Sequence, residues 1–456
     1  MNRKEQIAAK TDEMLENLSR LVRWNSVRSE PSEGAPFGAA PAGCLHEALE
    51  IAREMGFSVQ NLDQICGWAE MGEGKDIIGI AAHLDIVPAG DGWNTDPFTL
   101  TRAGDRVYGR GTTDDKGPLI AALYAMQLVR GSGIPMKKRV RLLMGTAEET
   151  GSECMKYYVN HAEPVSCGFT PDGSFPGIHG EKGMMFMRLV SKKTKILRME
   201  GGVVSNAVCG RCRAEVRACD ADANALRAAL QKTALTDFTV TEKDGILTVE
   251  AQGTAAHASL PQLGVNAAAC TMQALAEAGM QDAFVDFYNS RIGLSTDGSG
   301  LGLRFADDYG ALTLCNGTVR TENGVIICSL DLRTPVTVTE AQLRAACAPY
   351  LSGDGGTVEI LSVRAPLFYP KDCKLVQDLY RAYVDVTGDT AHEPEVIGGG
   401  TYAKEIPGII AFGCEFPGRD YHIHDANEFL EIPEWLLQVE IYAKAIENML
   451  KEECAE

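Results

Sequence analysis

The sequence contains no run of roughly 18 or more apolar residues, the length that a membrane-spanning helix requires. Its opening segment, MNRKEQIAAKTDEML, scatters charges and has no apolar block followed by a small-residue cleavage site, so it does not match a secretory signal. Solenoid-type repeats and low-complexity linkers are also missing. We therefore expect a cytoplasmic protein that is neither exported nor embedded in a membrane.

The sequence has fewer basic than acidic residues. Lys and Arg total 43 against 62 Asp and Glu, which gives a net charge of -19. A negative field of this size repels DNA and anionic lipid, so we expect neither nucleic acid nor a membrane surface as a partner. Without an export signal, the 14 cysteines are expected to be reduced thiols. Cys209 and Cys212 form a C-x-x-C with no second pair at zinc-ribbon spacing, and we interpret them as ordinary thiols.

With 456 residues, 45% hydrophobic and 23% charged, the chain is long enough for two or three compact units. Apolar residues at helical spacing predict helices around residues 14–21 and 45–55. The apolar runs DIIGIAAH and RVRLLMG predict buried strands, separated by a helix that begins near Gly117. This alternation predicts an α/β domain with a mostly parallel sheet and helices on both faces.

The middle of the chain changes in character. TDFTVTEKDGILTVEAQG predicts a hairpin that turns at Asp244 and Gly245, and VIICSLDLR and GTVEILSV look like further antiparallel strands. The α/β pattern returns in LVQDLYRAYVDVTG and IIAFG. We expect an α+β lid domain at 184–366, inserted between two parts of a catalytic domain at 1–183 and 367–456.

Residues suited to bind metal follow the predicted strands. His83 and Asp85 lie in HLDIVP, and alternation along the strand predicts that the Asp85 carboxylate reaches the far nitrogen of the His83 ring. The others lie in later motifs: Asp114 in GRGTTDDKG, Glu148 and Glu149 in TAEETG, Asp172 in TPDGS and His424 in HDANE. Each motif alone is also compatible with an ordinary turn or a solvated loop.

The motifs HLDIVP, GRGTTDDKGP, AEETGS, TPDGSFP, GTAAHASLP, GGGTYA and HDANE, taken in this order, resemble those of the co-catalytic metallopeptidases. That family includes aminoacylases, carnosinases and glutamate carboxypeptidase. The sequence looks most like the bacterial Xaa-His dipeptidases of the peptidase V type. The resemblance spans nearly the whole chain.

The resemblance implies a role for each of these residues. His83 and Asp172 would hold one metal ion, Glu149 and His424 a second, and Asp114 would bridge them. It also implies a cis peptide between Asp114 and Asp115. Glu148 would be the general base, with Asp85 supporting the site.

Further residues match positions that handle the substrate. His257, in GTAAHASLP, corresponds to the lid histidine that stabilises the oxyanion. Arg333, in LDLRTP, corresponds to an arginine that grips a C-terminal carboxylate, and Asn206 to a lid asparagine near it. Gly399, Gly400 and Thr401, in GGGTYA, would offer backbone donors to the same carboxylate. The spacing of HDANE favours His424 as the ligand, with His422 as the alternative.

We therefore expect a metal-dependent dipeptidase that acts on small dipeptides. A deacylase of N-acyl amino acids is the alternative, and a non-catalytic metal-binding protein on the same fold is disfavoured because Glu148 is retained. Imidazole and carboxylate ligands favour zinc, with manganese or cobalt as alternatives. The insertion has room for two ferredoxin-like units, which favours a monomer with His257 acting in its own chain, although a homodimer stays open.

Overall fold

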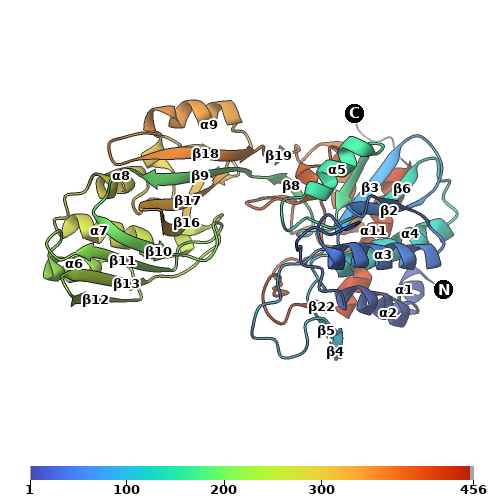
Figure 1. Cartoon of the computed structure of the whole chain (residues 1–456). Coiled ribbons are helices and arrows are strands. Elements are labelled where there is room, and N and C mark those ends of the chain that lie inside the picture. Colours follow the sequence, from blue (N-terminus) through green and yellow to red (C-terminus); the bar gives the residue numbers. More distant parts are fainter. Residues whose placement is uncertain (1, 452–456) are drawn as a thin grey trace. The chain divides into compact units, whose positions relative to one another are not determined.

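The computed structural model describes residues 2–451 and divides the chain into two compact units (Figure 1). Unit 1 joins Met1–Gly180 to Tyr369–Glu456, and unit 2 is Glu181–Phe368. The boundaries expected from the sequence, after residues 183 and 366, lie within a few residues of these limits. The assignment of unit 1 as a catalytic domain and of unit 2 as a lid stays a prediction.

A mixed sheet in the order β1-β2-β6-β3-β7-β21-β8-β19 runs through unit 1. Pairing is parallel at its centre, from β6 through β3 and β7 to β21, and antiparallel at β1, β2 and β8. The expected α/β class is confirmed. The strands are β1 Ser58–Leu62, β2 Cys66–Met71, β3 Ile77–His83, β6 Arg139–Gly145, β7 Cys167–Thr170, β8 Ile178–Glu181, β20 Glu395–Ile397 (beside β8) and β21 Ile409–Ala411, and the edge strand β19 Leu367–Phe368 consists of the last two residues of unit 2.

Both faces of this sheet are covered, because every residue of β3 is buried. Along β6, Val140, Leu142 and Met144 belong to the main core, whereas Arg141 points the other way and donates to the Tyr158 hydroxyl of α5. The helices of unit 1 are α1 Arg3–Ala8, α2 Thr11–Val22, α3 Ala39–Glu54, α4 Lys116–Gly131, α5 Glu153–His161, α10 Lys374–Thr387 and α11 Ile432–Lys451. The smaller sheet comprises β4 Thr101–Ala103, β5 Arg106–Tyr108 and β22 Phe429–Glu431.

The parallel pairing brings the predicted motifs to one edge of the sheet. His83 ends β3 and pairs in register with Gly145, which ends β6. On the other side of β3, the neighbouring strand β7 ends at Thr170. HLDIVP, TAEETG and TPDGS therefore leave the sheet side by side, at the carboxyl ends of the strands where open α/β sheets place their sites.

Unit 2 is built on one sheet in the order β12-β13-β11-β10-β16-β17-β9-β18. The predicted hairpin is confirmed: β12 and β13 pair around Asp244 and Gly245, which both have positive φ. The strands are β9 Gly183–Ser191, β10 Ile196–Gly201, β11 Arg211–Arg217, β12 Asp237–Lys243, β13 Ile246–Gln252, β16 Thr313–Glu322, β17 Val325–Thr334 and β18 Gly356–Arg364, with a separate pair, β14 Ala306–Asp307 and β15 Gly310–Ala311. The helices are α6 Ala223–Leu230, α7 Ala267–Glu277, α8 Ala283–Arg291 and α9 Glu340–Cys347.

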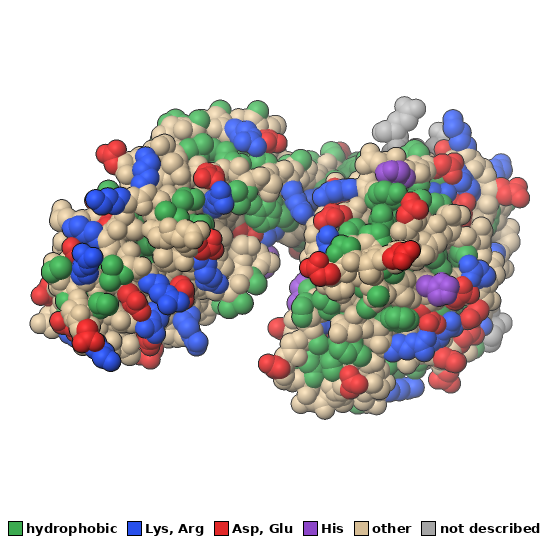
Figure 2. Space-filling model, in the orientation of Figure 1, with side chains coloured by type: hydrophobic (Ala, Val, Ile, Leu, Met, Phe, Trp, Pro, Cys, Tyr) green, Lys and Arg blue, Asp and Glu red, His purple; other side chains and the backbone are tan. Residues whose placement is uncertain are grey.

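The surface of each unit mixes positive and negative side chains on the face seen in Figure 2. Among the described residues, no helix is both long and apolar enough to cross a bilayer. Cys209 and Cys212 are buried free thiols, as interpreted from the sequence.

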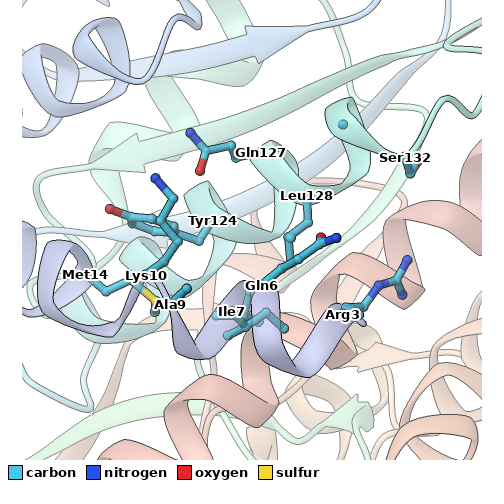
Figure 3. Close-up of a pocket in the computed structure, with 12 residues that line it drawn as sticks. Arg3, Gln6, Ile7, Ala9, Lys10, Met14, Tyr124, Gln127, Leu128 and Ser132 are labelled. Carbon is cyan, nitrogen blue, oxygen red and sulfur yellow. The ribbon is translucent and has the colours of Figure 1, made fainter. Parts of the chain in front are cut away.

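A cavity of about 470 Å³ lies among α1, α2, α4 and α11 of unit 1 (Figure 3). Its apolar lining includes Ile7, Met14 and Leu128, and its polar lining includes Arg3 and Lys10. Both of these cations are already paired, with Glu447 and Glu13 respectively. The described residues that line this cavity include none of the candidate metal ligands, so the chemistry has to be sought at the carboxyl ends of the strands.

Candidate metal centre

The Asp114 carboxylate lies between two imidazoles. Its Oδ1 atom is 2.8 Å from Nε2 of His83, and its Oδ2 atom is 2.8 Å from Nε2 of His424. His83 ends β3, whereas His424 lies some 340 positions later, in the loop that precedes β22. A carboxylate with one oxygen toward each imidazole has the arrangement that a bridging ligand requires.

The remaining candidate ligands lie beside these two histidines. Asp172 Oδ2 is 4.0 Å from His83 Nε2, and Glu149 Oε1 is 3.1 Å from His424 Nε2. Donor atoms of His83, Asp114 and Glu149 all lie within 4.8 Å of one another, and so do those of His83, Glu148 and Asp172. The structure therefore brings all five predicted ligands, and Glu148 with them, to one place in unit 1.

The electrostatics of the cluster favour cations. Burial opposes a charge on His424, but hydrogen bonds to Asp114 and Glu149 outweigh it and raise the pKa of His424 to about 11. Burial likewise opposes ionisation of Asp114, yet His83 and His424 hold the pKa of Asp114 below its usual value. Burial, reinforced by the charge on Asp172, raises the pKa of Glu148 well above its usual value. Crowded carboxylates of this kind are stabilised by any positive charge placed among them.

Asp85 supports the cluster in a way that differs from the expectation. The closest partner of His83 Nδ1 is the backbone carbonyl of Asp85, at 2.9 Å, while the Asp85 carboxylate is 3.6 Å away. That carboxylate instead accepts hydrogen bonds from the backbone N–H groups of Glu148 and Glu149, at 2.9 and 3.1 Å. Strand alternation did not apply, because β3 ends at His83 and Asp85 lies beyond it. Asp85 therefore positions both glutamates, and its carbonyl orients the His83 ring.

Glu428 is a supporting residue that the sequence analysis missed. Its buried carboxylate accepts hydrogen bonds from the backbone N–H groups of Gly111, Thr113 and Asp114, at 2.9, 2.8 and 3.1 Å. It also pairs with the buried Arg110 guanidinium at 2.8 Å. Glu428 closes the HDANE motif, so it ties the loop of His424 to the loop of Asp114. Glu428 was visible as the last residue of the HDANE motif, but only the fold shows which groups its carboxylate contacts.

The peptide between Asp114 and Asp115 is cis, as the resemblance implied. The Asp115 carboxylate is buried, and its Oδ2 accepts from the backbone N–H of His83 at 3.1 Å. Asp114 therefore contacts the side chain of His83, and Asp115 contacts its backbone.

The GGGTYA loop lies next to the cluster within unit 1. Thr401 caps the short helix η4 Tyr402–Lys404, accepting from the backbone N–H of Ala403 at 3.1 Å. The Tyr402 ring packs edge-on against His83, with centroids 6.2 Å apart, and its hydroxyl is 3.0 Å from the Cys154 thiol. The contact of Tyr402 places the end of this loop beside His83. The role of Gly399, Gly400 and Thr401 in binding substrate stays a prediction.

Of the two neighbouring histidines, His424 enters the cluster. The His422 ring turns toward Phe429, with centroids 5.8 Å apart, and its Nδ1 is 3.3 Å from the Ala426 carbonyl. Positive φ angles at both histidines separate their side chains, so the residues do not share a face as they would on a strand.

The other predicted site residues belong to unit 2. Asn206 and His257 are brought together there, because the Asn206 carbonyl accepts from Ala258 at 2.9 Å and Ala207 pairs with His257. Arg333 is buried in β17, and its guanidinium donates to both carboxylate oxygens of Asp331, at 2.8 and 2.9 Å. The guanidinium is thus held in a fixed orientation by Asp331. The contribution of all three residues to a site in unit 1 stays a prediction.

The donor set fits divalent cations. It combines two imidazoles with carboxylates and contains no thiolate, which suits zinc and also accommodates manganese or cobalt. Asp114 offers one oxygen to each side, His83 and Asp172 lie on one side, and His424 and Glu149 lie on the other. The cluster can therefore hold two ions with Asp114 between them.

Replacing Glu428 by Gln tests its role as a support. An amide cannot accept from all three backbone N–H groups and leaves Arg110 without its buried charge partner. We expect the Asp114 loop to loosen and metal affinity to fall by about 10- to 100-fold, measured by competition with a chelator.

Glu431→Gln is the matched control. Glu431 lies three residues after Glu428, at the end of β22, and pairs with the exposed Arg106 at 2.8 Å. Its replacement should leave metal affinity unchanged. Equal affinities for the Glu428→Gln variant and the parent would show that Glu428 does not support the site.

Comparison with known proteins identifies the family of the chain. The model of peptidase family M20/M25/M40 matches residues 79–448. A Bacillus subtilis (strain 168) protein named "Putative dipeptidase YtjP" is 32% identical over 468 residues, covering 99% of this chain and 100% of that protein. A Staphylococcus aureus (strain USA300) protein, "Putative dipeptidase SAUSA300_1697", is 33% identical over 470 residues, with coverage of 99% and 100%.

The fold is also that of solved structures. Human carnosine dipeptidase 1 superposes with a TM-score of 0.59 at 17% identity, covering 99% of this chain and 98% of that one. The dipeptidase Dug1p from Saccharomyces cerevisiae gives a TM-score of 0.59 at 15% identity, with the same coverage. On the match to the family model and to relatives of full length, the chain belongs to peptidase family M20/M25/M40.

Proposed function

We propose that this protein is a dipeptidase that hydrolyses the peptide bond of small dipeptides at a pair of divalent metal ions. The observation that carries the proposal is the Asp114 carboxylate held between His83 and His424, with Glu148 beside them. The relatives of full length are named as dipeptidases, which supports the choice of substrate.

The two ions, held by His83, Asp172, Glu149 and His424 with Asp114 between them, would polarise the scissile carbonyl and acidify the attacking water. Glu148 then serves as general base and transfers the proton to the leaving amine. Burial raises the pKa of Glu148 well above its usual value, which favours its accepting a proton. Asp85 holds the Glu148 backbone through its 2.9 Å hydrogen bond and so keeps the base in place.

Unit 2 is proposed as the lid of residues 184–366. His257 would donate to the oxyanion, and Asn206 and Arg333 would contact the C-terminal carboxylate of the substrate. Gly399, Gly400 and Thr401 would offer backbone donors to the same group. The fixed orientation of the Arg333 guanidinium against Asp331 supports its assignment, because a bidentate grip depends on orientation.

Zinc is the proposed metal, with manganese and cobalt as alternatives, and the cytoplasm is the proposed location. A monomer is also proposed, with His257 acting in its own chain. The sheet of unit 2 supports this proposal, because its eight strands can be described as two four-stranded halves, β12-β13-β11-β10 and β16-β17-β9-β18, with helices beside them. Two such halves correspond to the two ferredoxin-like units that favour a monomer.

Reconstitution tests the function. Metal-depleted protein is loaded with zinc, manganese or cobalt, and light scattering gives the molecular mass of each preparation. The same preparations are assayed with dipeptides and with N-acetyl amino acids. We expect metal-dependent hydrolysis of dipeptides by a monomer. Turnover confined to N-acetyl amino acids would contradict the assignment as a dipeptidase and favour a deacylase. A dimeric active fraction would contradict the proposal that the enzyme is a monomer.

Replacing Glu148 by Gln should remove the base and spare the ligands. The turnover number is expected to fall by about 10²- to 10⁴-fold with two metal ions still bound, as measured by elemental analysis alongside kinetics. Glu153→Gln is the matched control, because Glu153 lies just beyond the same turn and pairs with Arg28 at 3.0 Å. A Glu148→Gln variant as active as this control would contradict the assigned mechanism.

A further inference from the structure

The His257 ring in unit 2 is held by its near neighbour Ser259. The Ser259 hydroxyl oxygen is 2.7 Å from Nδ1 of His257, and the backbone N–H of Ser259 donates to the same nitrogen at 3.3 Å. Ser259 is not part of the mechanism set out above.

These contacts decide which ring nitrogen of neutral His257 carries the proton. A backbone N–H can only donate, so Nδ1 of His257 has to present its lone pair to Ser259. The hydroxyl, which can donate or accept, then donates to Nδ1 as well. The proton of the neutral imidazole is therefore on Nε2.

Other histidines of the chain have the opposite arrangement. Nδ1 of His83, His161 and His179 lies 2.9, 2.8 and 2.7 Å from a backbone carbonyl, which only accepts. In their neutral form these rings carry the proton on Nδ1 and the lone pair on Nε2. For His83 that lone pair points at the cluster, as a metal ligand requires. His257 is thus arranged as a donor, and His83 as a ligand.

The backbone around His257 is fixed independently of the ring. The N–H of Ala258 donates to the Asn206 carbonyl at 2.9 Å, and its carbonyl accepts from the Thr313 hydroxyl at 3.1 Å. The N–H of Leu260 closes a turn onto the His257 carbonyl at 2.9 Å. Because these bonds use the main chain of residues 257 and 258, exchange of the Ser259 side chain should leave the loop in place.

We propose that Ser259 is a positioning residue that holds His257 as the Nε2–H tautomer, so that the imidazole donates a hydrogen bond to the oxyanion of the substrate. This inference rests on the proposed function, because the oxyanion role of His257 belongs to it. The tautomer itself does not depend on that role and can be measured separately.

The tautomer is read by ¹H–¹⁵N correlation spectra of the zinc-loaded full chain with ¹⁵N-labelled histidine, at a pH where the ring is neutral. Protonated and unprotonated ring nitrogens resonate far apart, His257→Ala identifies the signals, and His161 and His179 are internal references for the opposite tautomer. We expect an unprotonated Nδ1 and a protonated Nε2 for His257. A protonated Nδ1 in the parent would overturn the inference, whatever the activity of the protein.

Three replacements of Ser259 extend the test to kinetics. Ser259→Thr keeps the hydroxyl and should retain the tautomer and kcat. Ser259→Ala keeps only the longer amide contact, and kcat should fall about 5-fold with KM little changed. Ser259→Asp places a carboxylate, which only accepts, beside Nδ1; its charge should outweigh the longer 3.3 Å contact with the backbone N–H and move the proton to Nδ1, with a fall in kcat of about 10²- to 10³-fold, the loss expected when an oxyanion donor is removed.

The outcomes separate this inference from the proposed function. If dipeptides are not hydrolysed, the proposed function fails while the parent spectrum still decides the tautomer. If dipeptides are hydrolysed and the Asp replacement moves the proton without lowering kcat, the positioning role is overturned. Equal spectra for the Ala, Asp and parent chains would also overturn it.

Discussion

The arrangement of unit 1 depends on one carboxylate held between two imidazoles. Asp114 meets His83 and His424, each at 2.8 Å, and these three residues come from distant parts of the sequence. Burial alone would favour protonated, neutral carboxyls here, and the surrounding acids add repulsion. Such a cluster persists because positive charge is supplied locally, by imidazolium in the isolated chain and by cations when they are bound. The need to stabilise buried negative charge also explains why many hydrogen bonds around Asp114 are donated to carboxylates.

The supports around this centre are buried acids that accept from the backbone. Asp85 accepts from the N–H groups of Glu148 and Glu149, and Glu428 accepts from the loop that carries Asp114. Asp115 accepts from the N–H of His83. A carboxylate that accepts backbone N–H groups fixes the path of the main chain without occupying a ligand position. The candidate ligands are therefore positioned by buried acids that lie outside the set of candidate ligands.

The sequence was sufficient to predict the strands that carry the site, because DIIGIAAH and RVRLLMG are continuous apolar runs of strand length. Ordered motifs predicted which residues meet, and the structure brings His83, Asp114, Glu149, Asp172 and His424 together. The Asp85 carboxylate lies 3.6 Å from Nδ1 of His83, but its hydrogen bonds to the backbone of Glu148 and Glu149 were not predicted, because strand alternation was extended past the end of β3. Glu428 and Ser259 were missed for a different reason: their partners are backbone N–H groups and a ring nitrogen, and sequence patterns do not encode those contacts.

Anomalous diffraction from crystals grown with zinc would test the central claim most directly, because it locates each ion without reference to activity. We predict two peaks that flank the Asp114 carboxylate, one beside His83 and Asp172 and the other beside His424 and Glu149. A single peak, or peaks that do not have Asp114 between them, would contradict the account of Asp114 as the bridge between two metal ions.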